Sequence, residues 1–152
     1  MTYVAAEARQ ELLDAIGAAV DEIGVALAAL GEAHEQLDEA TADRLEAELF
    51  RPTQLAYGRA QRACAGFAAR HGLAGRAFAP AAPGAPSAGV KGFLEQAVTA
   101  VSAADARLAA LQDSMLPVEV GDAELRAGLA EVRTLVGTLR GRARELVRSF
   151  GR

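Results

Sequence analysis

Residues 125–150 read LRAGLAEVRTLVGTLRGRARELVRSF, and apolar residues recur in this stretch at spacings that alternate between four and three. The series is Leu125, Leu129, Val132, Val136, Leu139, Ala143, Leu146 and Phe150. A repeat averaging about 3.5 residues places these side chains on one face of an α-helix, as in coiled coils and most four-helix bundles. The stretch therefore predicts a helix over residues 122–150 that packs against neighbours along its whole length.

Two further segments carry a similar apolar seam. In residues 90–115 the series is Val90, Leu94, Ala97, Val101, Ala104, Leu108, Leu111 and Met115. In residues 13–37 it is Leu13, Ile16, Val20, Ile23, Leu27, Leu30, His34 and Leu37, with His34 as its one polar member. A helix with such a face leaves that face in water unless other helices cover it, so these segments are expected to pack together.

The remaining seam lies in residues 45–71 and begins with three successive spacings of four. Its members are Leu45, Leu49, Thr53, Tyr57, Ala60, Cys64, Phe67 and His71. Repeated spacings of four drift across the face of a regular helix, so we expect a phase change or kink near Pro52. Together the four seams predict an all-α protein, a four-helix bundle with coiled-coil-like heptad packing and helices over about residues 4–39, 42–71, 88–114 and 122–150.

Proline and glycine mark most of the breaks between these helices. Residues 73–87 are rich in both and form a linker between two helical hairpins, with Ser87 as a cap for the third helix. This linker is long enough to be either a loose loop at one end or a crossover along the bundle. Pro117 and Gly121 predict the next turn, and Asp122 is then expected to cap the fourth helix.

The first turn has no such marker, because residues 38–44 contain neither glycine nor proline. A turn near Thr41, with Thr41 or Asp43 as the cap of the second helix, would give four helices of comparable length. The competing interpretation is a single first helix that continues to Phe50 before Pro52.

Length and composition indicate one domain over residues 1–152. The longest apolar run, residues 15–20, is far shorter than the roughly 18 residues of a membrane span, and the first residues do not resemble a secretory signal. The single cysteine, Cys64, excludes an intramolecular disulfide, so a cytoplasmic location is expected.

The motifs of common catalytic and metal sites are absent from the sequence. The residues three positions before His34 and His71 are Gly31 and Ala68, so the Glu-x-x-His pairs of carboxylate-bridged metal bundles are missing. Phosphate-binding loops, paired Cys-x-x-Cys motifs and nucleophile elbows are missing as well. We therefore expect no enzymatic activity, no metal and no cofactor.

Three residues on the second seam, Tyr57, Cys64 and His71, are the candidates for a small-ligand pocket, since they recur every seven residues on one helix face. Their alternative role is structural, with Cys64 packed as a small apolar residue and His71 ending a helix. His34 has Asp38 one turn later, which could orient its imidazole, although a half-exposed histidine at a helix end is the simpler interpretation.

Gly17, Gly24 and Gly31 form another seven-residue series, directly after seam residues. Glycine inside a helix is about 0.8 to 1.0 kcal/mol less favourable than alanine. A close approach of a neighbouring backbone, with Ala56, Ala60 and Ala63 as the facing residues, would account for them, and drift in a glycine- and alanine-rich sequence is the alternative.

Charge is distributed unevenly along the chain. Residues 1–50 contain twelve acids and two bases, residues 51–77 five arginines and no acid, and residues 121–152 seven bases and four acids. Candidate interaction residues form two rows at heptad positions, an acidic row of Glu7, Asp14, Asp21 and Glu35 and a basic row of Arg126, Arg133 and Arg140. If the first and fourth helices were antiparallel neighbours, the rows could pair and fix their register. Otherwise they are two solvated faces.

The sequence thus predicts a non-enzymatic interaction or oligomerisation module of the adaptor or scaffold type, which binds a protein partner or a second copy of itself. The alternative is a small-ligand-binding or sensor bundle. A pI near 5.2 disfavours a nucleic-acid partner, and no membrane partner is expected.

Overall fold

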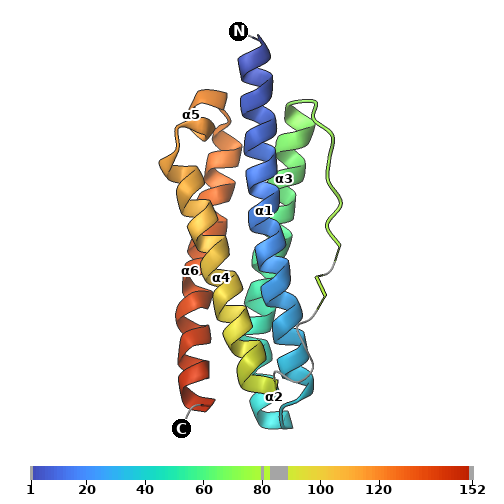
Figure 1. Cartoon of the computed structure of the whole chain (residues 1–152), viewed down its shortest axis with the longest axis vertical. Coiled ribbons are helices and arrows are strands. Elements are labelled where there is room, and N and C mark those ends of the chain that lie inside the picture. The colour runs from blue at the N-terminus through green and yellow to red at the C-terminus, as the bar shows by residue number, and fades with distance from the viewer. Residues whose placement is uncertain (1, 80, 83–88, 151–152) are drawn as a thin grey trace.

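A computed structural model describes residues 2–79, 81–82 and 89–150, and within these ranges the protein is helical with no strand (Figure 1). The elements are α1 (Thr2–Glu35), α2 (Glu39–Leu45), a π-helical turn η1 (Glu46–Phe50), α3 (Arg51–Arg70), α4 (Gly89–Asp113), α5 (Leu116–Val120) and α6 (Ala123–Phe150). The elements α2, η1 and α3 follow one another without a break, so they form one long helical segment.

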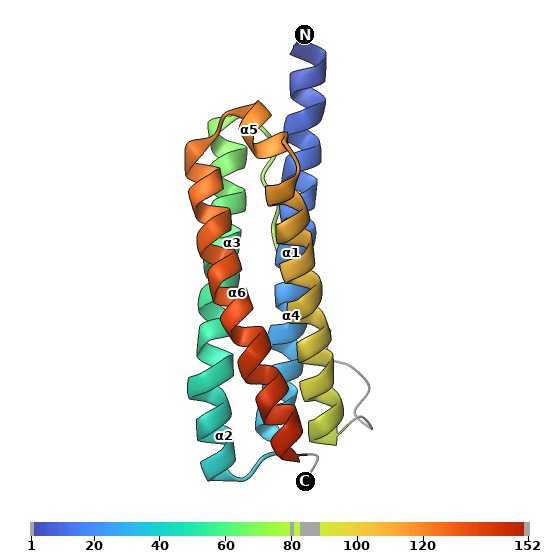
Figure 2. The same ribbon diagram turned by 90° about the vertical axis from the view of Figure 1, so that its left-hand side faces the viewer.

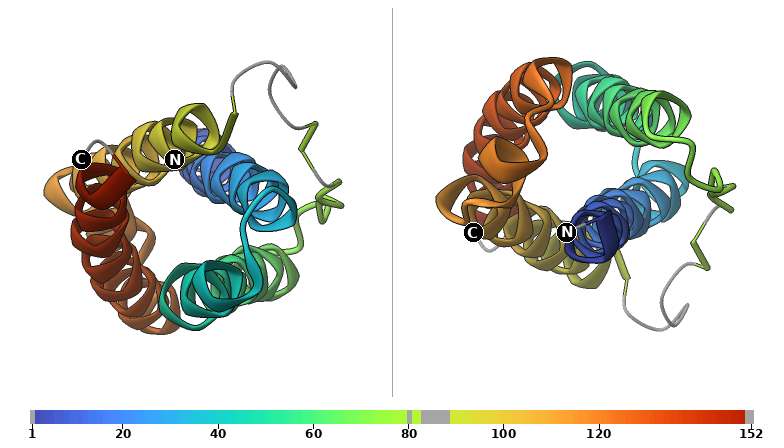
Figure 3. Two further views of the ribbon diagram at one scale, coloured as in Figure 1. Left: turned by 90° about the horizontal axis from the view of Figure 1, so that it is seen from below. Right: turned by 90° about the horizontal axis from the view of Figure 1, so that it is seen from above.

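The long helices form a ring in which each contacts two neighbours. Helix α1 packs against α3 and α4, and α6 packs against the same two helices. Within the described ranges, neither α1 and α6 nor α3 and α4 are in contact, so these pairs occupy diagonal corners (Figure 3). Neighbours around the ring run antiparallel, whereas the diagonal pairs run parallel (Figures 1 and 2).

The linker between α3 and α4 is a crossover rather than a loop at one end. Helix α3 ends at the end of the molecule where α1 begins, and α4 starts at the opposite end (Figure 1). Within the described part of the linker, Leu73 and Phe78 are half-buried against the core. The proposed cap Ser87 lies outside the described residues.

The core follows the predicted seams most closely in α6. Its seam residues from Leu125 to Leu146 are all buried, as are those of α4 from Leu94 to Leu111. Met115 was expected to extend the α4 seam, but its side chain is 59% exposed because α4 ends at Asp113. The residues of the predicted seam are therefore buried only where they belong to the helix, and not beyond its end.

In α1 the buried face is wider than one seam. Leu13, Ile16, Val20, Ile23 and Leu30 are buried as expected, but Leu12 and the alanines at 19, 26, 29 and 33 are buried too. Because α1 lies at a corner between α3 and α4, two neighbours cover two adjacent parts of its surface. The small alanine side chains permit that double packing.

The first turn lies at residues 36–38, a few residues earlier than expected, and Asp38 caps α2. The Thr41 amide donates a hydrogen bond of 3.2 Å to the Asp38 carboxylate. Hydrogen bonding with the Thr41 side chain, and then with its amide, lowers the pKa of Asp38. The prediction of Thr41 or Asp43 as the cap is therefore wrong, and so is the alternative of one helix to Phe50. The carboxylate of the cap accepts a hydrogen bond from the amide three residues later, so the cap lies before Thr41 and Asp43 in the chain.

The phase change expected near Pro52 is the π-helical turn η1. Leu45, Leu49 and Thr53 are all buried although they are successively four residues apart. A π-helical turn holds more residues than an α-helical one, so this spacing stays on one face. The predicted seam then continues in α3 at the buried residues Ala60, Cys64 and Phe67. Between Thr53 and Ala60, however, Ala56 is buried and the predicted seam member Tyr57 is only half-buried.

The turn predicted between Pro117 and Gly121 contains the short helix α5. Gly121 ends α5 with φ of 74°, a left-handed conformation that favours glycine. Asp122 then caps α6 as predicted, because its carboxylate accepts a 2.8 Å hydrogen bond from the Leu125 amide. Among the described residues, no helix combines the length and the apolarity required to cross a membrane.

Candidate interaction surface

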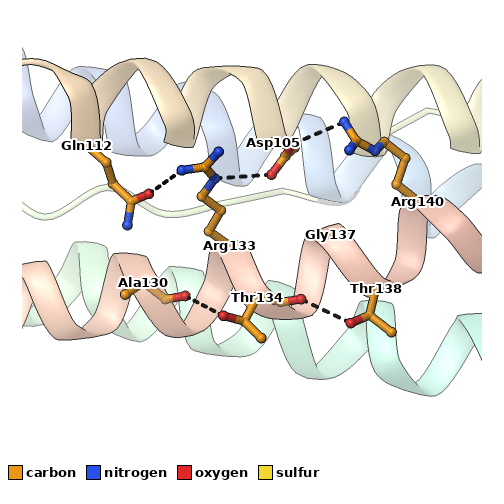
Figure 4. A pocket seen from close by; sticks show the side chains of 8 residues that line it. All are labelled: Asp105, Gln112, Ala130, Arg133, Thr134, Gly137, Thr138 and Arg140. Carbon is orange, nitrogen blue, oxygen red and sulfur yellow. Dashed lines mark hydrogen bonds and ion pairs between the residues drawn. The ribbon is translucent and has the colours of Figure 1, made fainter.

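A hollow of about 670 Å³ lies over the seam between α4 and α6. Figure 4 shows its lining, with α4 contributing two polar side chains and α6 contributing the rest. The lining residues are Asp105, Gln112, Ala130, Arg133, Thr134, Gly137, Thr138 and Arg140.

The hollow is centred on a carboxylate shared by two arginines. Arg133 lies 3.5 Å and Arg140 3.2 Å from the oxygens of Asp105, and Arg133 also donates to the Gln112 side chain at 2.8 Å. The Asp105 side chain is only 14% exposed, whereas the arginine side chains are 41% and 40% exposed. One carboxylate balances one guanidinium, so the hollow keeps a net positive charge on its accessible side.

The other α6 side chains in the hollow leave it shallow and accessible. The Thr134 and Thr138 hydroxyls donate to the backbone carbonyls of Ala130 and Thr134 in their own helix (Figure 4). A Cβ atom at Gly137 would have no neighbour within 4 Å. The surface around Gly137 is therefore open.

A second hollow of about 560 Å³ continues along the same seam toward the start of α4. Val98 and Val147 supply its apolar floor, and Arg144 and Arg148 stand at its α6 side, with Glu95 and Thr99 on α4. Because α4 and α6 run antiparallel, the second hollow is lined by earlier residues of α4 and later residues of α6 than the first. The two hollows therefore follow one another along the same seam. We call the two together the α4–α6 groove, lined on α6 by Arg133, Gly137, Arg140, Arg144, Val147 and Arg148.

The acidic row predicted on α1 is exposed but does not meet the basic row. Glu7, Asp14, Asp21 and Glu35 are all exposed. Asp14 accepts a hydrogen bond from Gln10, and Asp21 forms a 2.6 Å ion pair with Arg76 of the linker. At the far end of α1, Glu35 lines a small hollow with His34 and Phe50.

The prediction that the two rows pair within one chain is wrong. Helices α1 and α6 occupy diagonal corners and run parallel, so they are not antiparallel neighbours. Arg133 and Arg140 instead bind Asp105 of α4, and Arg126 is exposed. The sequence does not predict Asp105 as a partner of these arginines. Asp105 follows the seam residue Ala104, and a charged residue beside a seam is usually a solvent-exposed surface residue.

A second polar cluster joins the end of α3 to the start of α6. The Asp122 carboxylate, 4% exposed, accepts two hydrogen bonds of 2.9 Å from the Arg70 guanidinium and lies 2.9 Å from His71 Nε2. Burial by itself raises the pKa of Asp122, but the hydrogen bonds from the Leu125 amide, His71 and Arg70 outweigh it and hold the pKa below its ordinary value. An ionised carboxylate only accepts, so His71 carries its proton on Nε2.

The three candidate ligand residues each have separate surroundings. The Tyr57 ring lies beside Gly24, and Cys64 is a buried free cysteine. The His71 ring packs at a tilt against Phe67, with ring centroids 4.6 Å apart, and lies 2.9 Å from Asp122. Burial raises the pKa of the Cys64 thiol. The hollows described above are lined by other residues, so these three side chains are not brought together in them.

His34 and Asp38 are likewise not brought together as an acid–base pair. Asp38 binds the Thr41 amide, and half-buried His34 faces the small hollow at the end of α1. Among the described residues, no group of three or more histidine, cysteine, aspartate or glutamate side chains is suitably placed to hold a metal ion.

Large side chains, rather than a neighbouring backbone, lie against the three glycines of the series on α1. A Cβ at Gly17 would overlap the Arg76 guanidinium, one at Gly24 would lie 3.3 Å from the Tyr57 ring, and one at Gly31 would lie 3.8 Å from the Phe50 ring. The atoms nearest to these Cβ positions therefore do not belong to Ala56, Ala60 or Ala63, the expected facing residues. Ala63 instead lies opposite Gly128 of α6, at 3.4 Å from the position of its Cβ.

Gly17 therefore provides a notch that fixes the linker. The Arg76 side chain fills the notch, pairs with Asp21 and lies 4.8 Å above the Phe78 ring. The linker consequently covers one flank of α1.

Compared with protein-family models, with curated proteins and with solved structures, the chain matches none of them significantly.

Proposed function

We propose that the protein is a cytoplasmic, non-enzymatic interaction or oligomerisation module, a four-helix bundle with coiled-coil-like packing that presents charged faces to a protein partner. The observation that carries the proposal is the placement of opposite charges at diagonal corners. The acidic face of α1 and the arginines of α6 cannot reach one another within one chain. Glu7 and Glu11 on α1 and Arg144 and Arg148 on α6 form no ion pair among the described residues, so these side chains remain available to another polypeptide.

The α4–α6 groove is the surface that best fits such a partner. Arg144 and Arg148 are exposed at its edge, and within the described part of the chain they form no ion pair. Val98 and Val147 add apolar surface, worth roughly 25 cal/mol for each Å² that a partner covers. A basic rim around an apolar floor suits an acidic amphipathic helix. Charge complementarity gives specificity for such a partner, and burial of its apolar face contributes the affinity.

The small-ligand alternative receives less support. It was founded on Tyr57, Cys64 and His71, and each of these is engaged in packing or in the Asp122 cluster. Hollows over helix seams, open to solvent, suit a helix better than a small molecule, which binds in enclosed clefts.

Native mass spectrometry at low and high salt tests the proposal. We expect the wild-type protein to carry a bound polypeptide, its own copy or another chain, which dissociates as salt screens the charges. The double variant Arg144→Glu with Arg148→Glu should lose that polypeptide. The control Arg51→Glu with Arg62→Glu makes the same charge change on α3 and should keep it. A bare monomer at every salt and protein concentration would contradict the proposal.

A further inference from the structure

We propose that the α4–α6 groove receives the N-terminal half of α1 from a second copy of this chain, in antiparallel orientation. This inference rests on the proposed function and names the partner of the same surface. It is carried by the match between the acids of α1 and the arginines of α6 in sign, spacing and helical face.

The N-terminal half of α1 is available for such a contact. Helix α1 extends beyond α5 at its end of the molecule (Figure 2). Glu7, Glu11 and Asp14 are exposed, and within the described part of the chain no basic side chain pairs with any of them. The only base among residues 5–21 is Arg9, so this surface is strongly acidic.

The spacing of the acids matches the spacing of the arginines when the two helices run in opposite directions. From Glu7 the acids follow at intervals of four, three and seven residues, and from Arg148 the arginines recede at intervals of four, four and seven. The facing pairs are Glu7 with Arg148, Glu11 with Arg144, Asp14 with Arg140, and Asp21 with Arg133. At 3.6 residues per turn, each set lies within an arc of about 80° and spans about 21 to 22 Å.

Small residues meet at the centre of this register. Ala18 lies in the same arc as the acids, and antiparallel alignment places it opposite Gly137. A Cβ at Gly137 would have no neighbour within 4 Å in its own chain, so the groove is open there. Two helices approach most closely where their side chains are smallest, which lets the flanking charges reach one another.

The acidic stripe on α1 lies between two of the chain's own contacts. On one flank Arg76 fills the notch at Gly17, and on the other Arg107 lies 3.6 Å from Glu22. The stripe of Glu7, Glu11, Asp14, Ala18 and Asp21 runs between them. A second copy can therefore approach Glu7, Glu11 and Asp14 without displacing the linker or α4. A pair between Asp21 and Arg133 of the second copy replaces the pair between Asp21 and Arg76.

Mixing two one-sided variants tests this contact. The stripe variant carries Glu7→Lys and Glu11→Lys, and the groove variant carries Arg144→Glu and Arg148→Glu. Each alone sets like charges against each other and should remain a monomer of 15.7 kDa at low salt, with self-association weakened at least about tenfold. An equimolar mixture should restore the dimer mass, because each variant's altered surface matches the other's.

A steric variant provides a test that does not depend on charge. Gly137→Gln places a side chain at the proposed closest approach while it improves helix propensity, so the chain should fold at least as well as the wild type. It should nevertheless lose the dimer. Ala127→Gln, exposed on α6 but outside the arc, is the matched control and should keep it.

The outcomes separate this inference from the proposed function. Recovery of the dimer in the mixture, with loss in Gly137→Gln, supports the contact. A mixture that stays monomeric, or a stripe variant that assembles like the wild type, overturns it. If the wild type carries a different polypeptide in the groove and no second copy, this inference fails while the proposed function stands. If the wild type carries no polypeptide, both fail.

Discussion

The Asp122 carboxylate binds the Arg70 guanidinium through two hydrogen bonds of 2.9 Å, and the same carboxylate caps the first turn of α6. One buried side chain thus joins the end of α3 to the start of α6. The interaction is stronger than a surface ion pair because Asp122 is 4% exposed.

Replacing Asp122 with alanine should destabilise the protein more than most single changes. The substitution removes the cap of α6 and leaves the partly buried Arg70 and His71 without their acceptor. We expect the free energy of unfolding to fall by about 2 to 3 kcal/mol, measured by urea denaturation. Glu124→Ala is the control, since exposed Glu124 also binds Arg70 and should change stability by less than about 1 kcal/mol.

The stabilisation from Asp122 should disappear in acid. Its pKa in the folded state lies below the ordinary value of 3.8, so the folded state favours the ionised carboxylate. The resulting stability is fully present above the unfolded pKa and is lost as pH falls through the folded pKa. Urea midpoints measured between about pH 6 and pH 2 should therefore converge for wild type and Asp122→Asn. A constant difference over this range would exclude the carboxylate as the cause.

Gly17→Ala should release the linker without unfolding the protein. The new methyl group occupies the notch, and the flexible Arg76 side chain moves away and loses its pair with Asp21. The exposed pair is worth about 0 to 1 kcal/mol, and alanine adds about 0.8 to 1.0 kcal/mol of helix propensity. Urea stability should stay level or rise, while trypsin should cleave after Arg76 faster than in wild type.

Gly141→Ala is the matched control for that change. It brings the same gain in propensity at a position where a Cβ has no neighbour within 4 Å. Cleavage after Arg76 should then be as slow as in wild type. Equal cleavage rates in Gly17→Ala and Gly141→Ala would show that the notch does not hold the linker.

Thr53→Val should stabilise the protein. Thr53 is fully buried at the seam after η1, and its hydroxyl has no hydrogen-bond partner among the described residues. Valine has a similar shape without the unsatisfied oxygen, so the free energy of unfolding should rise by about 1 kcal/mol. Thr53→Ala removes volume as well and should not gain this stability. A loss in Thr53→Val would mean that the hydroxyl is satisfied in solution.

The sequence predicts the local features of the fold better than the arrangement of the helices. The seam of α6, the Asp122 cap and the irregularity before Pro52 depend on residues close in the chain, and the structure contains all three. Which helices become neighbours depends on the path of the linker, and its length permitted two paths. The pairing of the acidic and basic rows was wrong for that reason.

The candidate site was predictable only in part. The α6 arginines were visible as a heptad row, but their partner Asp105 comes from α4 and becomes recognisable only when α4 is known to be adjacent. The glycine notch was recognised as a series, yet its occupant, Arg76, lies in the linker, where no periodicity guides the assignment.

The crossover has a further consequence for how the chain reaches its native state. The most extensive interface joins α1 to α4, which belong to different hairpins and are separated by the whole of α2, α3 and the linker. Contacts between residues so far apart in the sequence raise the contact order and slow folding relative to a bundle whose successive helices are all neighbours. During synthesis, the face of α1 that packs against α4 stays uncovered until α4 has left the ribosome, and we expect chaperones to protect it in that interval.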